Sequence, residues 1–355
     1  MHFAFTGEQA MIAETARGFF VDNATSQRTR LAMADEGIDR ALWSAFCGEL
    51  GLSGIGLPED FGGAGLGMVE FAIVAEAAGA RVAALPLLGL ATAARAIAEG
   101  GSAAQRAEWL PKLVSGEAIA VNSSNPDLTE AGGRLTGRVR LVPHGGIADL
   151  FVLRNREASW LVRADAPGVA VHSHTTMDQT RPMATITLDN TPCDPLPDYA
   201  AGLAASREGG WICLAAEALG GAQEALDRTV AFSLERVQFG RRIGSFQAYK
   251  HRLADLMVDV EQARSAVYWA ACAVDEGSDE AALALHAAKS FAADTVFKCA
   301  ANMIQLHGGI GFTWEHDAHL FFKRARSVQT MMGGSEWHRE RIAAMTLGEM
   351  GGEAA

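Results

Sequence analysis

The 355-residue sequence has few cysteines, few aromatic residues, no long apolar run and no excess of positive charge. Its five cysteines are odd in number, far apart and never in a CxxC pair, so neither a disulfide framework nor a zinc site is expected. The ten histidines are scattered as well, and no metal site is predicted. No window reaches about 18 uninterrupted apolar residues, so no membrane span is predicted.

The charge balance is acidic. Asp and Glu number 42 against 30 Lys and Arg, and the resulting net charge of −12 disfavours nucleic acid as a partner. The first residues carry acids at Glu8 and Glu14 and lack the basic-then-apolar layout of a signal peptide, so we expect a cytoplasmic protein. Because 49% of the residues are apolar, the chain can bury a large core, and its length suggests two or three domains of about 150 residues.

The pattern along the chain predicts three domains. Residues 1–116 are expected to form an N-terminal helical domain, in which Thr6 and Gln9 fit a capping box. Asp39 to Leu50 are expected to form a second helical stretch, and residues 57–67 form a Pro/Gly loop. Residues 117–200 contain short β-branched runs separated by turn residues, which predict a small antiparallel β domain of six or seven strands. Residues 201–355 return to long helical spacing, from Trp211 onward, and predict a four-helix bundle.

Two segments of the third block carry the chemical signal. The segment ERVQFGRRIGSFQAYKHR, residues 235–252, concentrates basic residues in an otherwise acidic chain and suits a pyrophosphate, because Arg matches phosphate oxygens bidentately. The segment QLHGGIGFTWEHD, residues 305–317, places three glycines at the end of a predicted helix. The first pattern alone is also typical of a solvated helix end, and the second of a helix C-cap and turn.

Together with LPEDFGGAGLGMVE (residues 57–70) and QRAEWLPKLVSGE (residues 105–117), these segments make the chain resemble the acyl-CoA dehydrogenases over nearly its whole length. The resemblance implies a mainly α fold with a small central β domain between a helical domain and a four-helix bundle. It implies FAD at a subunit interface, an acyl-CoA substrate and an electron-transfer acceptor. In this family a carboxylate removes an α-proton from the thioester while a β-hydride passes to the flavin.

Carried over residue by residue, the resemblance retains the half of the flavin site that one subunit lends to its neighbour. Positive charge and amide groups at these positions suit the pyrophosphate and adenine end of FAD. The residues implied to bind the cofactor are Arg236, Gln238, Phe239, Gln247, Gln305, Gly308 and Gly309.

The half of the site that serves the subunit itself departs from the family. The position of the catalytic Glu aligns with Met332, whose thioether cannot abstract a proton. The other position used by some relatives aligns with Gly210, two residues from Glu208. In the β domain, the flavin loop is shortened to residues 122–127, and Leu141 and Pro143 replace a Trp and a Thr. Pro143 also lacks a backbone N–H.

These departures favour a base-lacking subunit of a heteromeric dehydrogenase, such as a heterotetramer acting in fatty acid or steroid side-chain β-oxidation. In this interpretation the chain pairs with a second, complete subunit and fills its partner's FAD site. One alternative is a self-sufficient homo-oligomer with Glu208 or Glu336 as an unconventional base. Another is a structural homologue that binds no flavin.

Overall fold

The computed structural model describes residues 5–348; the first four residues of the predicted helical domain and the last seven of the predicted bundle lie outside this range. The chain divides into two compact units. The helical unit contains the residues up to Ser26, Ala72–Ala83 and the chain from Leu214 onward, and the mixed unit contains Gln27–Phe71 and Ala84–Cys213. The threefold division at residues 116 and 200 stays a prediction.

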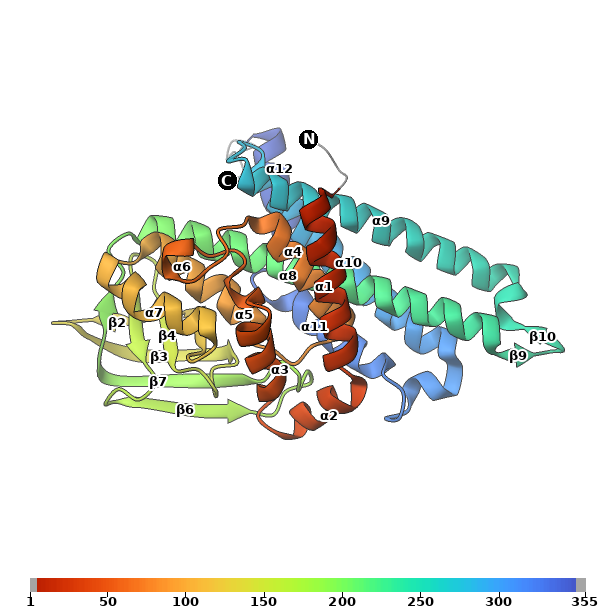
Figure 1. Cartoon of the computed structure of the whole chain (residues 1–355), viewed down its shortest axis with the longest axis horizontal. Coiled ribbons are helices and arrows are strands. Elements are labelled where there is room, and N and C mark those ends of the chain that lie inside the picture. Colours follow the sequence, from red (N-terminus) through yellow and green to blue (C-terminus); the bar gives the residue numbers. More distant parts are fainter. Residues whose placement is uncertain (1–4, 349–355) are drawn as a thin grey trace, which may run out of the picture. The chain divides into compact units, whose positions relative to one another are not determined.

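The helical unit is built from α1 and the long helices of the second half of the chain. In Figure 1 the long helices run roughly along one direction, and a two-stranded hairpin, β9–β10, projects where α8 passes into α9. Its helices are α1 (Gly7–Asn23), most of α4 (Met68–Ala80), α8 (Tyr199–Glu235) from Leu214, α9 (Gln247–Asp275), α10 (Ala281–His307), α11 (Ala318–Thr330) and α12 (Ser335–Leu347).

Close backbone contact joins α4 and α8. A Cβ added at Gly79 would lie 2.1 Å from the carbonyl oxygen of Glu217, and one at Gly220 would lie 1.8 Å from that of Glu76. Glycine at both positions therefore lets the two helices approach more closely than any side chain would allow. Glu76 also accepts hydrogen bonds from Arg264 at 2.5 Å and from the Tyr268 hydroxyl at 2.6 Å, which ties α9 to the same crossing.

The mixed unit combines short helices with two β-sheets. The helices are α2 (Ser26–Ala34), α3 (Arg40–Ser44), α5 (Leu87–Gly89), α6 (Arg95–Gly100) and α7 (Ala103–Ser115). One sheet has the strand order β1-β4-β5-β8, from β1 (Ala120–Ser124), β4 (Leu150–Arg154), β5 (Ser159–Arg163) and β8 (Asp194–Pro195). The other has the order β2-β3-β7-β6, from β2 (Thr129–Glu130), β3 (Arg134–Pro143), β7 (Met183–Pro192) and β6 (Val169–His174).

The two sheets enclose one apolar core. Val139, Val142 and Ile186 of the second sheet are fully buried with Phe151 and Val162 of the first. The predicted small antiparallel β domain is confirmed, with one exception in its pairing, because β1 and β4 are parallel. The stretch between them contains β2 and β3 and is long enough for the crossover that a parallel pair requires.

Element boundaries follow the sequence pattern with two exceptions. The capping box of Thr6 and Gln9 is confirmed at the start of α1. The helix predicted from Trp211 begins twelve residues earlier, at Tyr199. Glycines weaken the helical pattern in the sequence of this first stretch of α8. Gly209 lies so close to the Ala91 carbonyl that a Cβ would be 2.3 Å from its oxygen, so glycine is required there. Tertiary packing here overrides the low helix propensity of glycine.

The helix predicted from Asp39 to Leu50 is also irregular, since α3 passes into a π-helical turn at Ala45–Glu49. Between residues 5 and 348, no helix has the length and apolar character needed to cross a membrane.

Candidate functional site

Three of the residues implied to bind the cofactor lie in the β9–β10 hairpin or directly before it. Gln238 lies in β9, Phe239 lies in the turn, and Arg236 precedes β9. The hairpin pairs Val237–Gln238 with Arg241–Arg242 around a two-residue turn. Phe239 and Gly240 form that turn with φ values of 54° and 73°, as a type I′ hairpin turn requires. Glycine accepts this conformation freely, whereas a bulky residue such as phenylalanine does so at an energetic cost. The Phe239 side chain is nevertheless 90% exposed, so it is not held there by burial in the chain's own core.

Ring and hydrogen-bond contacts bring the hairpin and the glycine-rich segment to the same end of the bundle. The Tyr249 hydroxyl donates to the carbonyl of Leu306, next to Gln305, at 3.0 Å, and Tyr249 lies in the first turn of the helix that Gln247 begins. Phe232, near the end of α8, stacks on His307 with ring centroids 4.4 Å apart. The structure therefore brings together the two chain segments, residues 235–252 and 305–317, that contain the predicted cofactor-binding residues.

Gly308 and Gly309 follow the last residue of α10. Gly308 has φ 63° and ψ −143°, a backbone conformation that is nearly restricted to glycine. A Cβ at either position would meet nothing within 4 Å. Position 308 therefore requires glycine because of its backbone conformation and not because of crowding. Both residues are exposed, and the Gly308 N–H donates to the Gln305 carbonyl.

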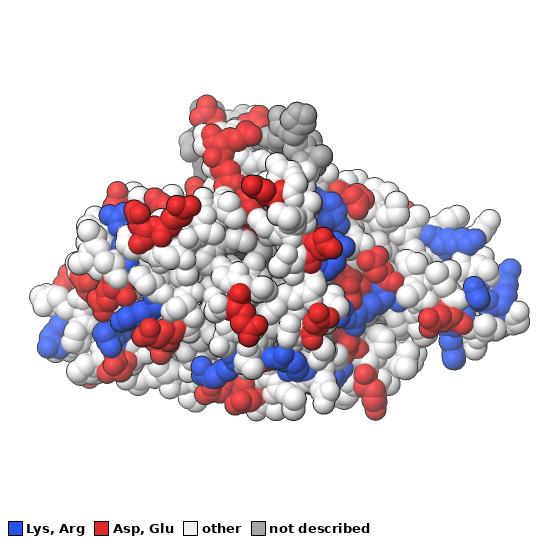
Figure 2. Space-filling model, viewed as in Figure 1, with Lys and Arg blue, Asp and Glu red and all other residues white. Residues whose placement is uncertain are grey.

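This end of the bundle is basic. Figure 2 shows blue side chains around the right-hand end of the molecule, where Figure 1 places β9 and β10. Arg241 lies over the Phe246 ring at 4.0 Å. Among residues 5–348, the exposed guanidinium of Arg236 has no hydrogen-bond or ion-pair partner. The side-chain amide of Gln238 donates to the Val237 carbonyl at 2.8 Å and is exposed, so this end of the bundle offers charged and amide groups to a phosphate-bearing ligand.

Met332 lies in the turn between α11 and α12. Its φ of 53° and that of Gly333, 104°, form a left-handed turn. The buried ammonium of Lys289 holds this turn, donating to the carbonyls of Gly333 and, at 3.4 Å, Gln329. Burial lowers the pKa of Lys289 to about 8. The turn is thus firmly anchored, and the Met332 side chain, at the position predicted for the base, has no ionisable group.

The two carboxylates considered as alternative bases occupy different surroundings. Glu208 is half-buried in the mixed unit and pairs with Arg95 at 3.4 Å. Burial raises its pKa, while the charge of Arg95 acts in the opposite direction. Glu336 is exposed in the first turn of α12. Gly210, at the position used by some relatives, lies within α8 and offers no side chain.

Three features of the β domain depart from the pattern that the resemblance implies: Leu141, Pro143 and the loop of residues 122–127. A bulge in β3 puts Leu141 at φ 55° with a 63% exposed side chain. Pro143 pairs with Met183 at the end of the strand and has no N–H to donate to a ligand. In the shortened loop, Asn125 donates to the Arg138 carbonyl at 2.5 Å and accepts from the Asp127 amide, so the loop folds back on its own sheet.

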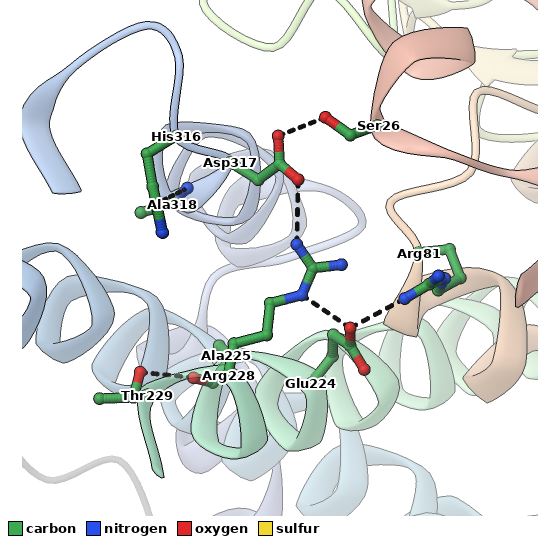
Figure 3. A network of polar contacts seen from close by, with 9 residues as sticks. All are labelled: Ser26, Arg81, Glu224, Ala225, Arg228, Thr229, His316, Asp317 and Ala318. Carbon is green, nitrogen blue, oxygen red and sulfur yellow. Dashed lines mark hydrogen bonds and ion pairs between the residues drawn. The ribbon is translucent and has the colours of Figure 1, made fainter. Parts of the chain in front are cut away.

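A polar network in the helical unit was not anticipated from the sequence. In Figure 3 the Arg228 side chain lies between Glu224 and Asp317, bonding to them at 2.7 and 2.9 Å. Glu224 also pairs with Arg81 at 2.9 Å, and Asp317 accepts from the Ser26 hydroxyl. The four-residue spacing of Glu224 and Arg228 was the one available sequence signal. Because Asp317 directly precedes α11, the network fixes the end of the glycine-rich segment relative to α8.

Comparison with known proteins agrees with this architecture. The family model for the acyl-CoA dehydrogenase N-terminal domain matches residues 6–117, and that for the acyl-CoA dehydrogenase C-terminal domain matches residues 208–347. The chain belongs to the acyl-CoA dehydrogenase family, whose members are oxidoreductases that act on acyl-CoA.

Individual relatives cover almost the full length. The chain is 35% identical to acyl-CoA dehydrogenase IpdE2 of Mycolicibacterium smegmatis, over 95% of this chain and 98% of that protein. A variant of the Tcur3481-Tcur3483 steroid ACAD superposes with a TM-score of 0.87 at 32% identity, covering 95% of this chain and 97% of that one. The ChsE4-ChsE5 complex from Mycobacterium tuberculosis gives a TM-score of 0.89 at 28% identity, covering 98% and 99%.

Proposed function

We propose that this chain is the base-lacking subunit of a heteromeric, FAD-dependent acyl-CoA dehydrogenase and completes the flavin site of a partner subunit. The observation that carries the proposal is the contrast between the predicted cofactor-binding residues and the predicted position of the catalytic base. Cofactor-binding donors stand exposed together at the hairpin end of the bundle, whereas the anchored turn at the base position presents Met332.

The donor set fits FAD. Arg236 offers an exposed guanidinium that can bind a pyrophosphate oxygen pair, and Gln247 and Gln305 offer exposed amides for an adenine or ribose edge. Gly308 presents backbone in a conformation that a larger residue would not adopt, and Phe239 offers an exposed ring. FAD, when bound, accepts the hydride that leaves the β-carbon of the acyl group.

The chain's own residues therefore bind and orient, and do not move the α-proton. A thioether at position 332 has no proton to exchange. Glu208 is engaged by Arg95, and Glu336 is solvent-exposed. Turnover then needs a carboxylate from the partner subunit, because proton abstraction requires a base within hydrogen-bond reach of the α-carbon.

The relatives support the heteromeric assembly and a bulky substrate. Two structural neighbours bear paired names, Tcur3481-Tcur3483 and ChsE4-ChsE5, and the first is described as a steroid ACAD. We extend this to the present chain as a CoA ester of a steroid side chain or a fatty acid, with an electron-transfer protein as acceptor. A cytoplasmic location remains part of this proposal.

A test is the count of FAD per chain. The full chain is purified alone and together with a base-containing acyl-CoA dehydrogenase subunit. We expect the chain alone to hold little flavin and the complex to hold one FAD for each pair of chains. Full occupancy and acyl-CoA oxidation by the chain alone would contradict the proposal.

The variant Arg236→Gln sharpens this test. Loss of one charge-assisted hydrogen bond should weaken flavin binding in the complex about tenfold to a hundredfold. The matched control is Arg163→Gln, which removes an exposed arginine that pairs with Asp165 and lies outside the hairpin. Equal flavin loss from both variants would show a general charge effect and would refute the assignment of Arg236.

A second candidate function, a self-sufficient homo-oligomer, is favoured by one observation. Glu208 is half-buried and its pKa is raised, as expected of a carboxyl group suited to take up a proton. If the chain alone oxidises acyl-CoA and Glu208→Gln abolishes the oxidation with FAD retained, this alternative replaces the heteromeric proposal.

A further inference from the structure

The glycine-rich segment lies between the end of α10 and the start of α11. It forms a 3₁₀ turn over Gly308–Phe312 and continues to Asp317, which directly precedes α11. Gly308 and Gly309 are exposed within this turn, whereas Gly311 is buried. Because the segment is short, the orientation of its exposed backbone depends on the contacts that hold its two ends.

Ring contacts hold the first end of the segment. His307, the last residue of α10, is buried and stacks on Phe232 of α8. Its ring also lies 4.5 Å from that of His316, which is near the far end of the same segment. Burial lowers the pKa of His307, and the positive charge of Arg228 acts in the same direction. Arg228 of α8 therefore lies close to this end as well.

The carboxylate of Asp317 holds the second end. An Asp that directly precedes a helix usually accepts a hydrogen bond from a backbone N–H of the first turn. The side chain of Asp317 makes no such capping bond to α11, all of whose residues the structure describes. It accepts instead from Arg228 at 2.9 Å and from the Ser26 hydroxyl, as Figure 3 shows. The carboxylate thus serves contacts with other elements of the helical unit and not its own helix.

Arg228 is itself held in one orientation. Its Nε atom donates to Glu224, one turn earlier on α8, and Glu224 is held in turn by Arg81. The guanidinium lies over the Phe321 ring of α11 at 5.2 Å. A planar guanidinium can donate to Glu224 and Asp317 at once with fixed geometry, whereas a lysine ammonium would supply the charge without the fork of donors. All these residues belong to the helical unit.

We propose that Arg228 is a positioning residue for the flavin site of the partner subunit. Through Asp317 it holds the exposed backbone of Gly308 and Gly309 in the orientation in which that backbone meets FAD. This inference rests on the proposed function, because the segment meets flavin only if the chain completes a partner's site. Arg228 acts through Asp317 and not by contact with the cofactor. A loosened segment would have to be ordered on binding, and this cost weakens affinity.

Two variants separate positioning from a simple effect of charge. Arg228→Met removes a positive charge and Asp317→Ala removes a negative one, so a long-range charge effect would change the affinity for anionic FAD in opposite directions. Positioning predicts that both variants weaken binding, each raising the Kd at least about fivefold. The double variant should lose no more than the larger single loss, because both substitutions disrupt the same contact.

The matched control is Arg264→Met. The Arg264 side chain is 31% exposed and pairs with Glu76 of another helix, much as the 32% exposed Arg228 pairs with Asp317. Both Met variants should lose similar stability in urea unfolding, but Arg264→Met should leave the FAD affinity unchanged. Arg228→Lys, which keeps the charge, should recover part of the affinity that Arg228→Met loses.

The experiment uses the complex with a base-containing acyl-CoA dehydrogenase subunit. The Kd is obtained from the rise in flavin fluorescence as each complex releases FAD on dilution. In parallel, hydrogen exchange of the chain alone follows the backbone amides of residues 305–317. We expect faster exchange there in Arg228→Met and Asp317→Ala than in wild type, and no change in Arg264→Met.

Three results would overturn the inference: an unchanged Kd in Arg228→Met, tighter FAD binding in Asp317→Ala, or equal weakening in Arg264→Met and Arg228→Met. Each of them leaves the proposed function standing, because the wild-type complex still binds FAD. A wild-type complex that binds no FAD would instead refute the proposed function, and this inference with it.

Discussion

The buried ion pair of Glu217 and Arg324 offers a sharp test of how the helical unit is held together. Glu217 lies on α8 and Arg324 on α11, with the guanidinium and carboxylate 3.4 Å apart. Their side chains are only 3% and 6% exposed, and Arg324 also donates to the Ala83 carbonyl at 3.3 Å. Replacement of Arg324 by Met keeps the volume similar but removes the charge that compensates Glu217.

The expected cost follows from this burial. Breaking a buried pair from one side leaves an uncompensated charge and destabilises by about 3–5 kcal/mol. Replacing both partners by apolar residues, in Glu217→Leu/Arg324→Met, removes that charge as well. The double variant should therefore be more stable than Arg324→Met by at least about 2 kcal/mol, because much of the single-variant cost is desolvation.

The assay is urea unfolding followed by tryptophan fluorescence, with the free energy of unfolding compared among wild type, both single variants and the double variant. Arg40→Met is the control, because Arg40 and Glu36 form an exposed pair with side chains 61% and 55% accessible. It should cost less than about 1 kcal/mol. The reasoning is refuted if Arg324→Met costs no more than this control, or if the double variant loses the full sum of the single losses.

Three further outcomes are expected. Gly220→Ala should destabilise the chain by more than about 2 kcal/mol in urea unfolding, because its Cβ would meet the Glu76 carbonyl. The control Gly18→Ala, whose Cβ would meet nothing within 4 Å, should be neutral or stabilising. Equal effects of the two variants would contradict the close crossing of α4 and α8. Phe239→Asn should raise the free energy of unfolding by about 1 kcal/mol by relieving the positive φ, yet lower flavin affinity in the complex; unchanged flavin affinity would remove Phe239 from the site. Burial lowers the pKa of Lys289 from 10.5 to about 8, so the folded chain binds fewer protons than the unfolded chain between these values and its stability should rise with pH there. The free energy of unfolding of wild type, relative to that of Lys289→Met, should grow by about 2 kcal/mol between about pH 7.5 and 9.5. A difference that stays constant over this range would show that the pKa of Lys289 is not lowered in the folded chain.

The long, strongly periodic helices and the capping box at Thr6 could be predicted, because local spacing and capping chemistry determine them. The first twelve residues of α8 could not. Gly202 and Gly209 lower helix propensity there, and only their contacts with the Ala96 and Ala91 carbonyls explain why they lie in a helix. The parallel pairing of β1 with β4 depends on which strands meet in space, and local alternation does not reveal this.

The candidate site also has features that the sequence predicts and features that it does not. The basic character of residues 235–252 was visible in the sequence, and the structure adds that Tyr249 joins this segment to the end of α10. The ion pair of Glu217 and Arg324 and the network through Asp317 were not visible, because their partners lie 89 to 291 positions apart in the sequence.

The central claim is that catalysis in the assembled enzyme uses the partner's base while this chain completes the flavin site. The most direct measurement is acyl-CoA oxidation by the purified complex carrying Met332→Ala, compared with the complex whose partner has lost its base carboxylate. The account predicts nearly unchanged kcat for Met332→Ala and loss of turnover, with FAD retained, for the partner variant. Loss of turnover with Met332→Ala, or full activity after removal of the partner's base, would contradict it.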